Sequence, residues 1–408
     1  MEKDKNHRVK GRLKQSNSKL NWILEITNAI NNNSSKDTLF EILRNLLTKE
    51  LHIGKFVLFT FHDNWQVSMK ENINPKEAKV NFDSLVEEFT NIQVLSSHKN
   101  PSLSHFDVII PAFHKKKPLA FLLLADFDGE KIEVSPIIKH LRFIQTLVNI
   151  IAVALENKRL NKEYIKQIAI KKELETAQKM QSLLFPKKLP KNAKMKVMAF
   201  YLPHSEVGGD YYDLIEMPNG NTAICVADVS GKGVSAAILM ANFQAQLRAL
   251  LTICEQVEEV VKQCNQKVIE SANFEKFITL YLAIYNPKER VLHSINAGHP
   301  PAIYSDKNGT QLLKKGCTVL GMFEELPFIE SENISIQGDG KLFCFSDGFS
   351  EMEDKKGICF EEADLSQIIQ EEPSSKKIHR KFESKISEVN KKTGLTDDIT
   401  YLLIDFPA

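Results

Sequence analysis

The sequence has few cysteines, and those it has are unevenly placed. There are 6 among 408 residues, all at or after Cys225, and no two form a CxxC pair. A thiol-linked chromophore or a cysteine-ligated cluster is therefore excluded from the first half of the chain. Cys225 and Cys344 lie inside apolar runs, where a free thiol packs as a small core residue. This usage is typical of a reduced, cytoplasmic protein.

Long apolar runs and an excess of either charge are also missing. No apolar run approaches the ~20 residues that a membrane-spanning helix needs; the longest are segments such as 120–125 and 147–155. Residues 1–19 are charged and lack the apolar centre of a secretory signal, so we interpret them as a flexible basic tail. The net charge of +1 argues against a nucleic-acid-binding surface. We therefore expect neither a membrane span nor a nucleic-acid partner.

The length of the chain predicts two domains with a connector. Residues 20–155 contain two helical patterns, then strand-like runs at 55–61, 106–111 and 118–126, then a closing helix. This order of elements resembles the GAF family. The resemblance implies an α/β sensor or dimerisation domain, with a small ligand that the sequence does not identify.

A helical connector is predicted over residues 156–186. No glycine or proline occurs from Leu155 through Phe185, and Pro186 ends the pattern. Apolar residues recur at coiled-coil-like spacing, with a shift in phase between two halves. They are Leu160, Tyr164, Ile168, Ile170, Leu174, Ala177 and Leu184. One amphipathic helix packed on its own domain would give the same pattern, but we favour a parallel helix that joins two copies in a homodimer.

Four aspartates in the second half each adjoin a strand-like stretch. They are Asp210 in VGGDYYD, Asp228 in VADVSGKG, Asp347 in CFSDGFSE and Asp397 in GLTDDIT. Asp228 and Asp347 follow their strands, whereas Asp210 and Asp397 precede theirs. If these strands run antiparallel in one sheet, all four carboxylates reach the same edge.

Four gathered carboxylates repel one another unless cations lie among them. An oxygen-only ligand set suits hard ions such as Mg²⁺ or Mn²⁺ rather than Zn²⁺. The alternative is that each aspartate belongs to a turn, because Asp before Gly is an ordinary turn signal. Any single one of the four is better explained as a turn residue. Four at matching strand ends favour a metal site.

Residues 187–408 alternate strands with two long helical patterns, which predicts an α+β fold. The motifs EVGGDYYD, VADVSGKG, FITLYLAIY, NAGHPP, SDGFSE and TDDIT occur in that order. Together they resemble the SpoIIE-type branch of the metal-dependent (PPM) serine/threonine protein phosphatases. ELETAQKMQSLLFP, just upstream, resembles the helix that precedes the catalytic domain in that family.

The resemblance implies an αββα sandwich that holds two Mn²⁺ or Mg²⁺ ions. It assigns catalytic roles to Asp228 and Asp347, with Asp228 bridging both ions. The complete implied ligand set is Asp210, Asp228, the carbonyl of Val229, Asp347 and Asp397.

Four further polar residues have weaker patterns. We interpret Asp398 as a neighbour that orients Asp397 and its loop. For His299, in NAGHPP, we favour a structural role over protonation of a leaving group, and we expect His204 at the surface. Lys232, in SGKG, fits a phosphate contact and a solvated loop position equally well.

The implied activity is hydrolysis of phosphoserine or phosphothreonine on a partner protein, controlled by the GAF-like domain. The family resemblance favours as substrate a STAS-domain anti-anti-sigma factor. A catalytically silent scaffold would lack at least one ligand aspartate, and all four are present. Two further hypotheses stay open: a small-molecule phosphoesterase, and a sensor whose phosphatase is always active.

Overall fold

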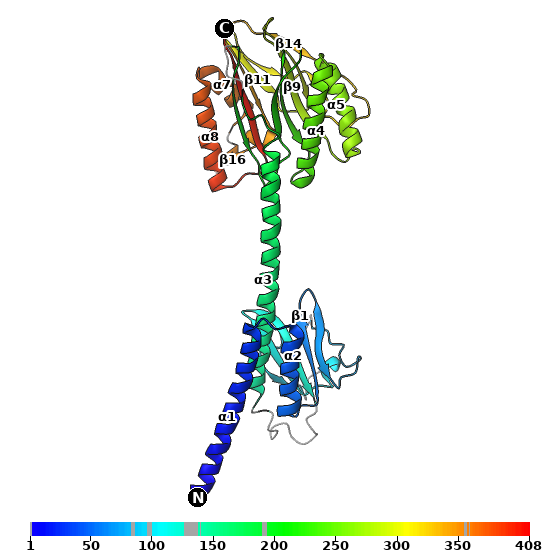
Figure 1. The fold of residues 1–408 in the computed structure, drawn as a ribbon, viewed down its shortest axis with the longest axis vertical. Coiled ribbons are helices and arrows are strands. Elements are labelled where there is room, and N and C mark those ends of the chain that lie inside the picture. Colours follow the sequence, from blue (N-terminus) through cyan, green and yellow to red (C-terminus); the bar gives the residue numbers. More distant parts are fainter. Residues whose placement is uncertain are drawn as a thin grey trace. The chain divides into compact units, whose positions relative to one another are not determined.

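The computed structural model describes residues 2–82, 86–95, 100–125, 138, 140–189, 194–354, 357–358 and 360–408. The chain divides into two compact units, residues 1–168 and 169–408, and the division falls inside the predicted connector. Figure 1 shows the elements of both units, and helix α3, Leu141–Gln181, contributes residues to each. The predicted α+β class is confirmed.

The N-terminal unit is built on one antiparallel sheet in the order β2-β1-β5-β4-β3. The strands are β1 Lys55–Phe61, β2 Trp65–Glu71, β3 Gln93–Val94, β4 Val108–His114 and β5 Lys117–Ala125. A short 3-10 turn, η2, spans Pro101–Leu103. The three strand-like runs expected from the sequence are therefore β1, β4 and β5, the central strands. Their apolar residues are buried on both faces of the sheet.

Helices cover one face of this sheet. Helix α2, Lys36–Asn45, starts at Ser35, whose hydroxyl accepts a hydrogen bond from the Thr38 amide at 3.1 Å, and continues into a π-turn, η1, Leu46–Glu50. Side chains of α1, α2, α3 and the sheet share one buried core. The opposite face is covered by aromatic rings, with Phe82 stacked on Phe121 at 5.0 Å between ring centroids. The GAF resemblance of this unit remains a prediction.

The predicted flexible tail is helical from its second residue. Residues 2–19 lie in helix α1, Glu2–Asn31. This segment contains no proline, and its second half buries Ile26 while Trp22 and Ile30 pack against the same core. Packing there fixes a helical nucleus, which the Lys-, Arg- and Leu-containing first half can extend because these residues favour helix.

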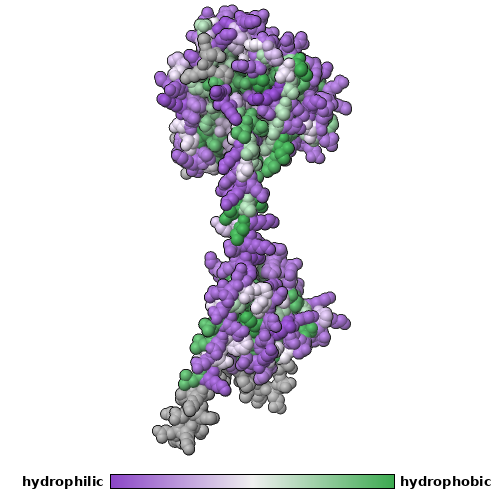
Figure 2. All heavy atoms as spheres, viewed as in Figure 1, coloured by the Kyte–Doolittle hydropathy of each residue, from purple (hydrophilic) through white to green (hydrophobic). Residues whose placement is uncertain are grey.

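Helix α3 carries exposed apolar side chains. Leu160, Tyr164, Ile165, Ile168 and Ile170 are each more than a third exposed, and Figure 2 shows green side chains among purple ones on this helix. The helix ends at Gln181, before Pro186, and a turn follows. Four of these five residues belong to the stripe predicted to join two copies. A helix that leaves such a stripe exposed is available to a partner helix.

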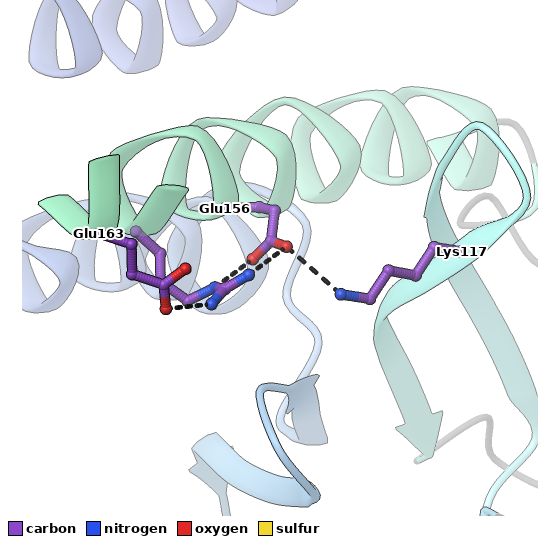
Figure 3. A network of polar contacts seen from close by, with 4 residues as sticks. Lys117, Glu156 and Glu163 are labelled. Atoms are coloured by element: carbon purple, nitrogen blue, oxygen red, sulfur yellow. Dashed lines mark hydrogen bonds and ion pairs between the residues drawn. The ribbon is translucent and has the colours of Figure 1, made fainter. Parts of the chain in front are cut away.

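A polar network ties α3 to the β4–β5 hairpin (Figure 3). The partly buried Glu156 carboxylate accepts hydrogen bonds from Arg159 Nε at 2.8 Å and Nη2 at 2.9 Å, and pairs with Lys117 Nζ at 3.4 Å. Arg159 also donates to Glu163 at 2.6 Å. The hydrogen bonds from Arg159, together with the charges of Arg159 and Lys117, lower the pKa of Glu156 from 4.5 to about 2.

Glu156→Gln is expected to destabilise the N-terminal unit by about 1–2 kcal/mol at neutral pH. The folded-state pKa of Glu156 lies below its ordinary value, so its contribution is present above about pH 4.5 and is lost as pH falls toward 2. The difference in melting temperature between the variant and the wild type should therefore shrink over that range. Tryptophan fluorescence can measure it, because the 2 tryptophans, Trp22 and Trp65, both lie in this unit.

Glu163→Gln is the matched control, since this carboxylate is 56% exposed and its one ion pair within the described part of the chain is with Arg159. It should cost a few tenths of a kcal/mol at most. Equal losses from both variants, or a loss that does not change with pH, would contradict the role given to Glu156.

The C-terminal unit contains two large sheets. The first has the order β13-β10-β9-β8-β7, with β14 paired to β10, and the second has the order β12-β11-β15-β18-β6. The first is formed by β7 Tyr211–Glu216, β8 Thr222–Val229, β9 Ile278–Asn286, β10 Val291–Ala297, β13 Gly316–Cys317 and β14 Glu332–Ser335. The second is formed by β6 Lys196–Leu202, β11 Ala302–Asp306, β12 Gly309–Leu313, β15 Gly340–Phe345 and β18 Ile399–Phe406. A small hairpin, β16 Glu353–Asp354 and β17 Gly357–Ile358, lies outside both.

The sheets pack face to face with a helical layer on each outer side, as Figure 1 shows. Helices α4, Val234–Ile253, and α5, Val257–Ala272, cover the first sheet, and α7, Glu362–Glu371, and α8, Ser375–Lys392, cover the second. Strand β8 illustrates the reason: Cys225 faces the helices while Ile224 and Val226 face the other sheet. A strand that is apolar on both faces needs a layer on each. The predicted αββα arrangement is therefore present.

Helix α4 corrects one inference from the sequence. It is the one helix in the described part of the chain that is long and apolar enough in composition to cross a bilayer, which a search for uninterrupted apolar runs missed. Eight of its residues are buried in the unit, Phe243 and Leu247 among them. The apolar character of α4 is thus explained by its place as a core helix of the sandwich.

Candidate metal centre

The four predicted aspartates lie at one end of the sandwich, but they come from two sheets. Asp210 precedes β7, and Asp228 is the next-to-last residue of β8, which pairs with β7 in antiparallel register. Asp347 follows β15 and Asp397 precedes β18, an antiparallel pair in the second sheet. The prediction of a single shared sheet is therefore wrong. Because these strands are apolar on both faces, they form two stacked sheets, and the stacking still brings both pairs of loops to the same end.

Asp210 connects the two sheets directly. It is 1% exposed, and its Oδ2 accepts a hydrogen bond from the Thr400 hydroxyl at 2.6 Å. Thr400 lies in β18, 190 residues away in sequence. Burial and the charges of Asp228 and Asp398 raise the pKa of Asp210 well above its ordinary value. The raised pKa shows that a bound cation would relieve an unfavourable negative charge at this position.

Asp398 holds the loop that carries Asp210. Its carboxylate accepts hydrogen bonds from the backbone amides of Gly209 at 2.6 Å, His204 at 2.7 Å and Asp210 at 3.4 Å. Its own amide donates to Asp397 Oδ1 at 2.8 Å. The sequence pattern assigned Asp398 to the Asp397 loop, whereas its side chain mainly fixes the loop on the other sheet. The predicted surface position of His204 is confirmed.

Asp228 lies close to the loop of Asp210 and has a raised pKa. A Cβ added at Gly209 would lie 2.9 Å from the Val229 carbonyl oxygen and 3.5 Å from Asp228 Oδ1, so only glycine allows the Asp210 loop to approach this closely. Burial, followed by the charges of Asp347 and Asp397, raises the pKa of Asp228 to about 7. Asp228, in the first sheet, is therefore close enough to the carboxylates of the second sheet for their charge to shift its pKa.

The loops of Asp347 and Asp397 are also in contact. A Cβ at Gly348 would lie 2.1 Å from the Asp398 carbonyl oxygen and 3.0 Å from Asp397 Cβ. Burial and the charge of Asp397 raise the pKa of Asp347. Asp397 pairs with Lys232 at 2.8 Å, and the same ammonium donates to the Thr396 carbonyl. Lys232 thus lies at the acidic cluster in an exposed position, and its ammonium group is already paired with the Asp397 carboxylate.

The candidate ligand atoms are of the type that divalent cations such as Mg²⁺ and Mn²⁺ prefer. Asp210, Asp228, Asp347, Asp397 and the Val229 carbonyl offer oxygen only, as Mg²⁺ and Mn²⁺ prefer. Among the described residues, no three His, Cys, Asp or Glu side chains have converged into a metal-binding group. The assignment of these five ligands remains a prediction.

His299 lies beside this cluster in a buried, neutral form. Its Nδ1 is 2.8 Å from the Thr279 hydroxyl, and Thr279 lies opposite Asp228 in the β8–β9 ladder. The backbone of His299 is bracketed by the side-chain amide of Asn296 at 2.7 and 2.8 Å. Burial lowers the pKa of His299 to about 3. These contacts agree with the structural role favoured from the sequence.

Two residues of the site were not found by sequence reasoning. Thr400 belongs to the TDDIT motif, but its bond to Asp210 crosses between sheets. Gln181, at the end of α3, bonds to the backbone of Gly208. The one signal in the sequence was a neutral glutamine two positions before the apolar LLFP segment that ends the charged connector.

Comparisons with known proteins agree with this architecture. Residues 218–407 match the family described as Stage II sporulation protein E (SpoIIE). The match includes Asp228, Asp347 and Asp397, whereas Asp210 lies before it. The SiaA-PP2C domain of Pseudomonas aeruginosa has a similar structure, with a TM-score of 0.50 and 17% identity, over 60% of this chain and 98% of that one. At this identity the likeness shows the fold alone.

Two curated proteins of Bacillus subtilis (strain 168) are similar in sequence. Phosphoserine phosphatase RsbU is 31% identical over 208 residues, which are 50% of this chain and 61% of RsbU. Phosphoserine phosphatase RsbP is 28% identical over 243 residues, 58% of each protein. The chain therefore spans about three-fifths of the length of these relatives.

Proposed function

We propose that this chain, whose residues 218–407 form a domain of the SpoIIE family, is a metal-dependent protein serine/threonine phosphatase. The observation that carries the proposal is the gathering of Asp210, Asp228, Asp347 and Asp397 from two sheets at one end of the sandwich. The elevated pKa of Asp228, caused by burial and by Asp347 and Asp397, supports a site built to receive cations. The names of the similar proteins RsbU and RsbP support phosphoserine as the substrate group.

Two Mn²⁺ or Mg²⁺ ions bound by the four aspartates and the Val229 carbonyl would supply a water of lowered pKa and neutralise charge on a phosphoryl group. The chain supplies the placement of these ligands. Thr400 and Asp398 fix Asp210 and its loop, and glycines at 209 and 348 allow the loops to meet. For His299 we propose a structural role rather than that of a general acid, because burial lowers the pKa of its imidazole to about 3.

For the substrate we propose a phosphorylated partner protein, with a STAS-domain anti-anti-sigma factor as the favoured class. For regulation we propose that the GAF-like unit acts through α3. The exposed apolar side chains of α3 support a homodimer joined by this helix, as in a short coiled coil. A small ligand of the GAF-like unit and a cytoplasmic location remain predictions.

Hydrolysis of p-nitrophenyl phosphate by the full chain is expected to require added Mn²⁺ or Mg²⁺. Chelation with EDTA should remove the activity and added Mn²⁺ should restore it, because the carboxylates bind the cations that activate water. Release of phosphate from a phosphoserine protein, measured in parallel, tests the substrate class. A scaffold would bind that protein without releasing phosphate at any Mn²⁺ concentration. A small-molecule phosphoesterase would cleave the nitrophenyl ester and leave the phosphoprotein intact.

A further inference from the structure

The last helical residue of α3, Gln181, makes a buried two-bond contact with the loop that leads to Asp210. Its side chain is 7% exposed. Nε2 donates to the Gly208 carbonyl at 2.7 Å, and Oε1 accepts from the Gly208 amide at 3.2 Å. The Gln181 side chain thus bonds to both the amide and the carbonyl of Gly208, which fixes the loop in position and in orientation.

The next peptide of the same loop is held from the other side. The Gly209 amide donates to Asp398 at 2.6 Å, and Asp398 precedes strand β18 of the second sheet. The segment 208–209 is therefore held between the end of α3 and the second sheet, directly before Asp210. If Gln181 moved away, the buried amide and carbonyl of Gly208 would lose this partner. The loop would then be held only from the side of the second sheet, by Asp398 and by the bond of Thr400 to Asp210.

The end of α3 is itself docked on the sandwich by apolar and polar contacts. The Phe185 ring lies 4.5 Å from the Tyr201 ring and 5.1 Å from the Tyr212 ring, measured between centroids. The Leu184 carbonyl accepts from Gln244 of α4 at 3.4 Å. These contacts set where the last turn of α3 lies. A shift of about 1 Å at this turn would stretch the 2.7 Å and 3.2 Å bonds of Gln181 to the limit of hydrogen-bond geometry or beyond it.

We propose that Gln181 is a positioning residue that makes metal affinity depend on the placement of α3. It holds Gly208 so that Asp210 faces Asp228, and movement of the helix end releases that hold. This inference rests on the proposed metal site and adds that the end of helix α3 controls its affinity for metal ions. It requires no contact between Gln181 and a metal ion or substrate.

The test compares Gln181→Leu with Gln178→Leu in the full chain. Leucine keeps the apolar bulk at position 181 and removes both hydrogen bonds. Gln178 is exposed on the same helix and provides the matched control. Binding of Mn²⁺ is measured by electron paramagnetic resonance, which counts free ion without any need for activity. The Mn²⁺ concentration that gives half-maximal hydrolysis is measured alongside.

We expect Gln181→Leu to weaken Mn²⁺ binding about tenfold, the effect of losing one to two hydrogen bonds. Hydrolysis at saturating Mn²⁺ should stay within about threefold of wild type, since the carboxylates themselves remain. Gln178→Leu should match wild type in both measurements. Gln181→Met introduces an unbranched side chain of similar length and should also weaken Mn²⁺ binding about tenfold. This second variant shows whether the effect comes from the lost hydrogen bonds or from poor packing of leucine.

Several results would overturn the inference. These are unchanged Mn²⁺ affinity in both 181 variants, an equal loss in Gln178→Leu, and loss of folding in both 181 variants, which would assign Gln181 to stability instead. Wild-type chain that binds no Mn²⁺ would remove the metal site and the inference together. Wild-type chain that binds Mn²⁺ without hydrolysing phosphoesters would overturn the proposed activity alone, because the resonance measurement still tests Gln181.

Discussion

Asp228→Asn is expected to lower Mn²⁺-dependent hydrolysis about 1000-fold, which corresponds to ~4 kcal/mol of lost transition-state stabilisation. The amide keeps the size of the side chain and removes its charge. Asp228 lies in the first sheet and its pKa is raised by Asp347 and Asp397 beside the second, so it is well placed to join ligands from the two sides. Initial rates across a range of Mn²⁺ concentrations measure the loss, and excess Mn²⁺ should not restore it.

The same variant has a second expected result in metal-free protein. The folded-state pKa of Asp228, about 7, lies above the ordinary value of 3.8, so the charged carboxylate destabilises the fold increasingly as pH rises between these values. Asp228→Asn should therefore unfold at a higher temperature than wild type at neutral pH when EDTA is present. Wild-type activity in the variant would contradict the proposed site, and a lower melting temperature would contradict the electrostatic argument.

Asp306→Asn is the matched control for both measurements. Asp306 ends strand β11 and pairs with Gly340 at the start of β15, whereas Asp347 follows the end of β15. It therefore lies at the opposite end of the second sheet from the acidic cluster. Rate and metal-free stability should both stay close to wild type.

The individual elements of the site were visible in the sequence because their signals are local. Strand β7, Tyr211–Glu216, begins directly after Asp210 as the sequence predicts, because its alternation and the glycines before it involve neighbouring residues only. The position of each aspartate at a strand end follows from the same signals. Pairing of strands into two sheets is not local: β18 pairs with β6, about 200 residues earlier, and no short-range pattern specifies that partner.

The residues that hold the site in place were harder to find for the same reason. Thr400 and Asp398 act on a loop about 190 residues away, and Gln181 acts on a loop 27 residues away. Each is an unremarkable polar residue in sequence, and its role appears only once the chain has folded. Helix α1 was missed because its first half is charged and has no apolar pattern of its own. The segment is helical because the second half of the helix packs on a buried core. Local sequence patterns predicted the candidate ligands, whereas the residues that position them appear only in the tertiary contacts.

Arg248→Met is expected to destabilise the C-terminal unit by about 3 kcal/mol. Asp213, in β7, is fully buried, and Arg248 of α4 donates to it from Nε at 2.7 Å and from Nη2 at 3.1 Å. The Tyr211 hydroxyl also donates to this carboxylate. Removal of the guanidinium leaves a buried negative charge with two neutral donors, the Tyr211 hydroxyl and the Leu214 amide. A buried charge without an opposite charge beside it is costly.

The loss should appear as a fall of about 6–12 °C in the melting temperature of the C-terminal unit. Far-ultraviolet circular dichroism detects this transition, and tryptophan fluorescence should not follow it, because Trp22 and Trp65 lie in the other unit. Arg380→Met, at an exposed position of α8, is the matched control and should shift the transition by less than about 2 °C.

A second substitution separates the lost charge pair from lost packing of the arginine stem. Adding Asp213→Asn to Arg248→Met removes the unpaired charge, so the double variant should be more stable than Arg248→Met alone by about 1–2 kcal/mol. If the double variant is no more stable, the cost of the single substitution comes from packing, and the buried ion pair is not what joins α4 to β7. Recovery would instead show that the pair fixes α4 against the strand that begins directly after Asp210, and so connects the stability of the sandwich to the geometry of its acidic end.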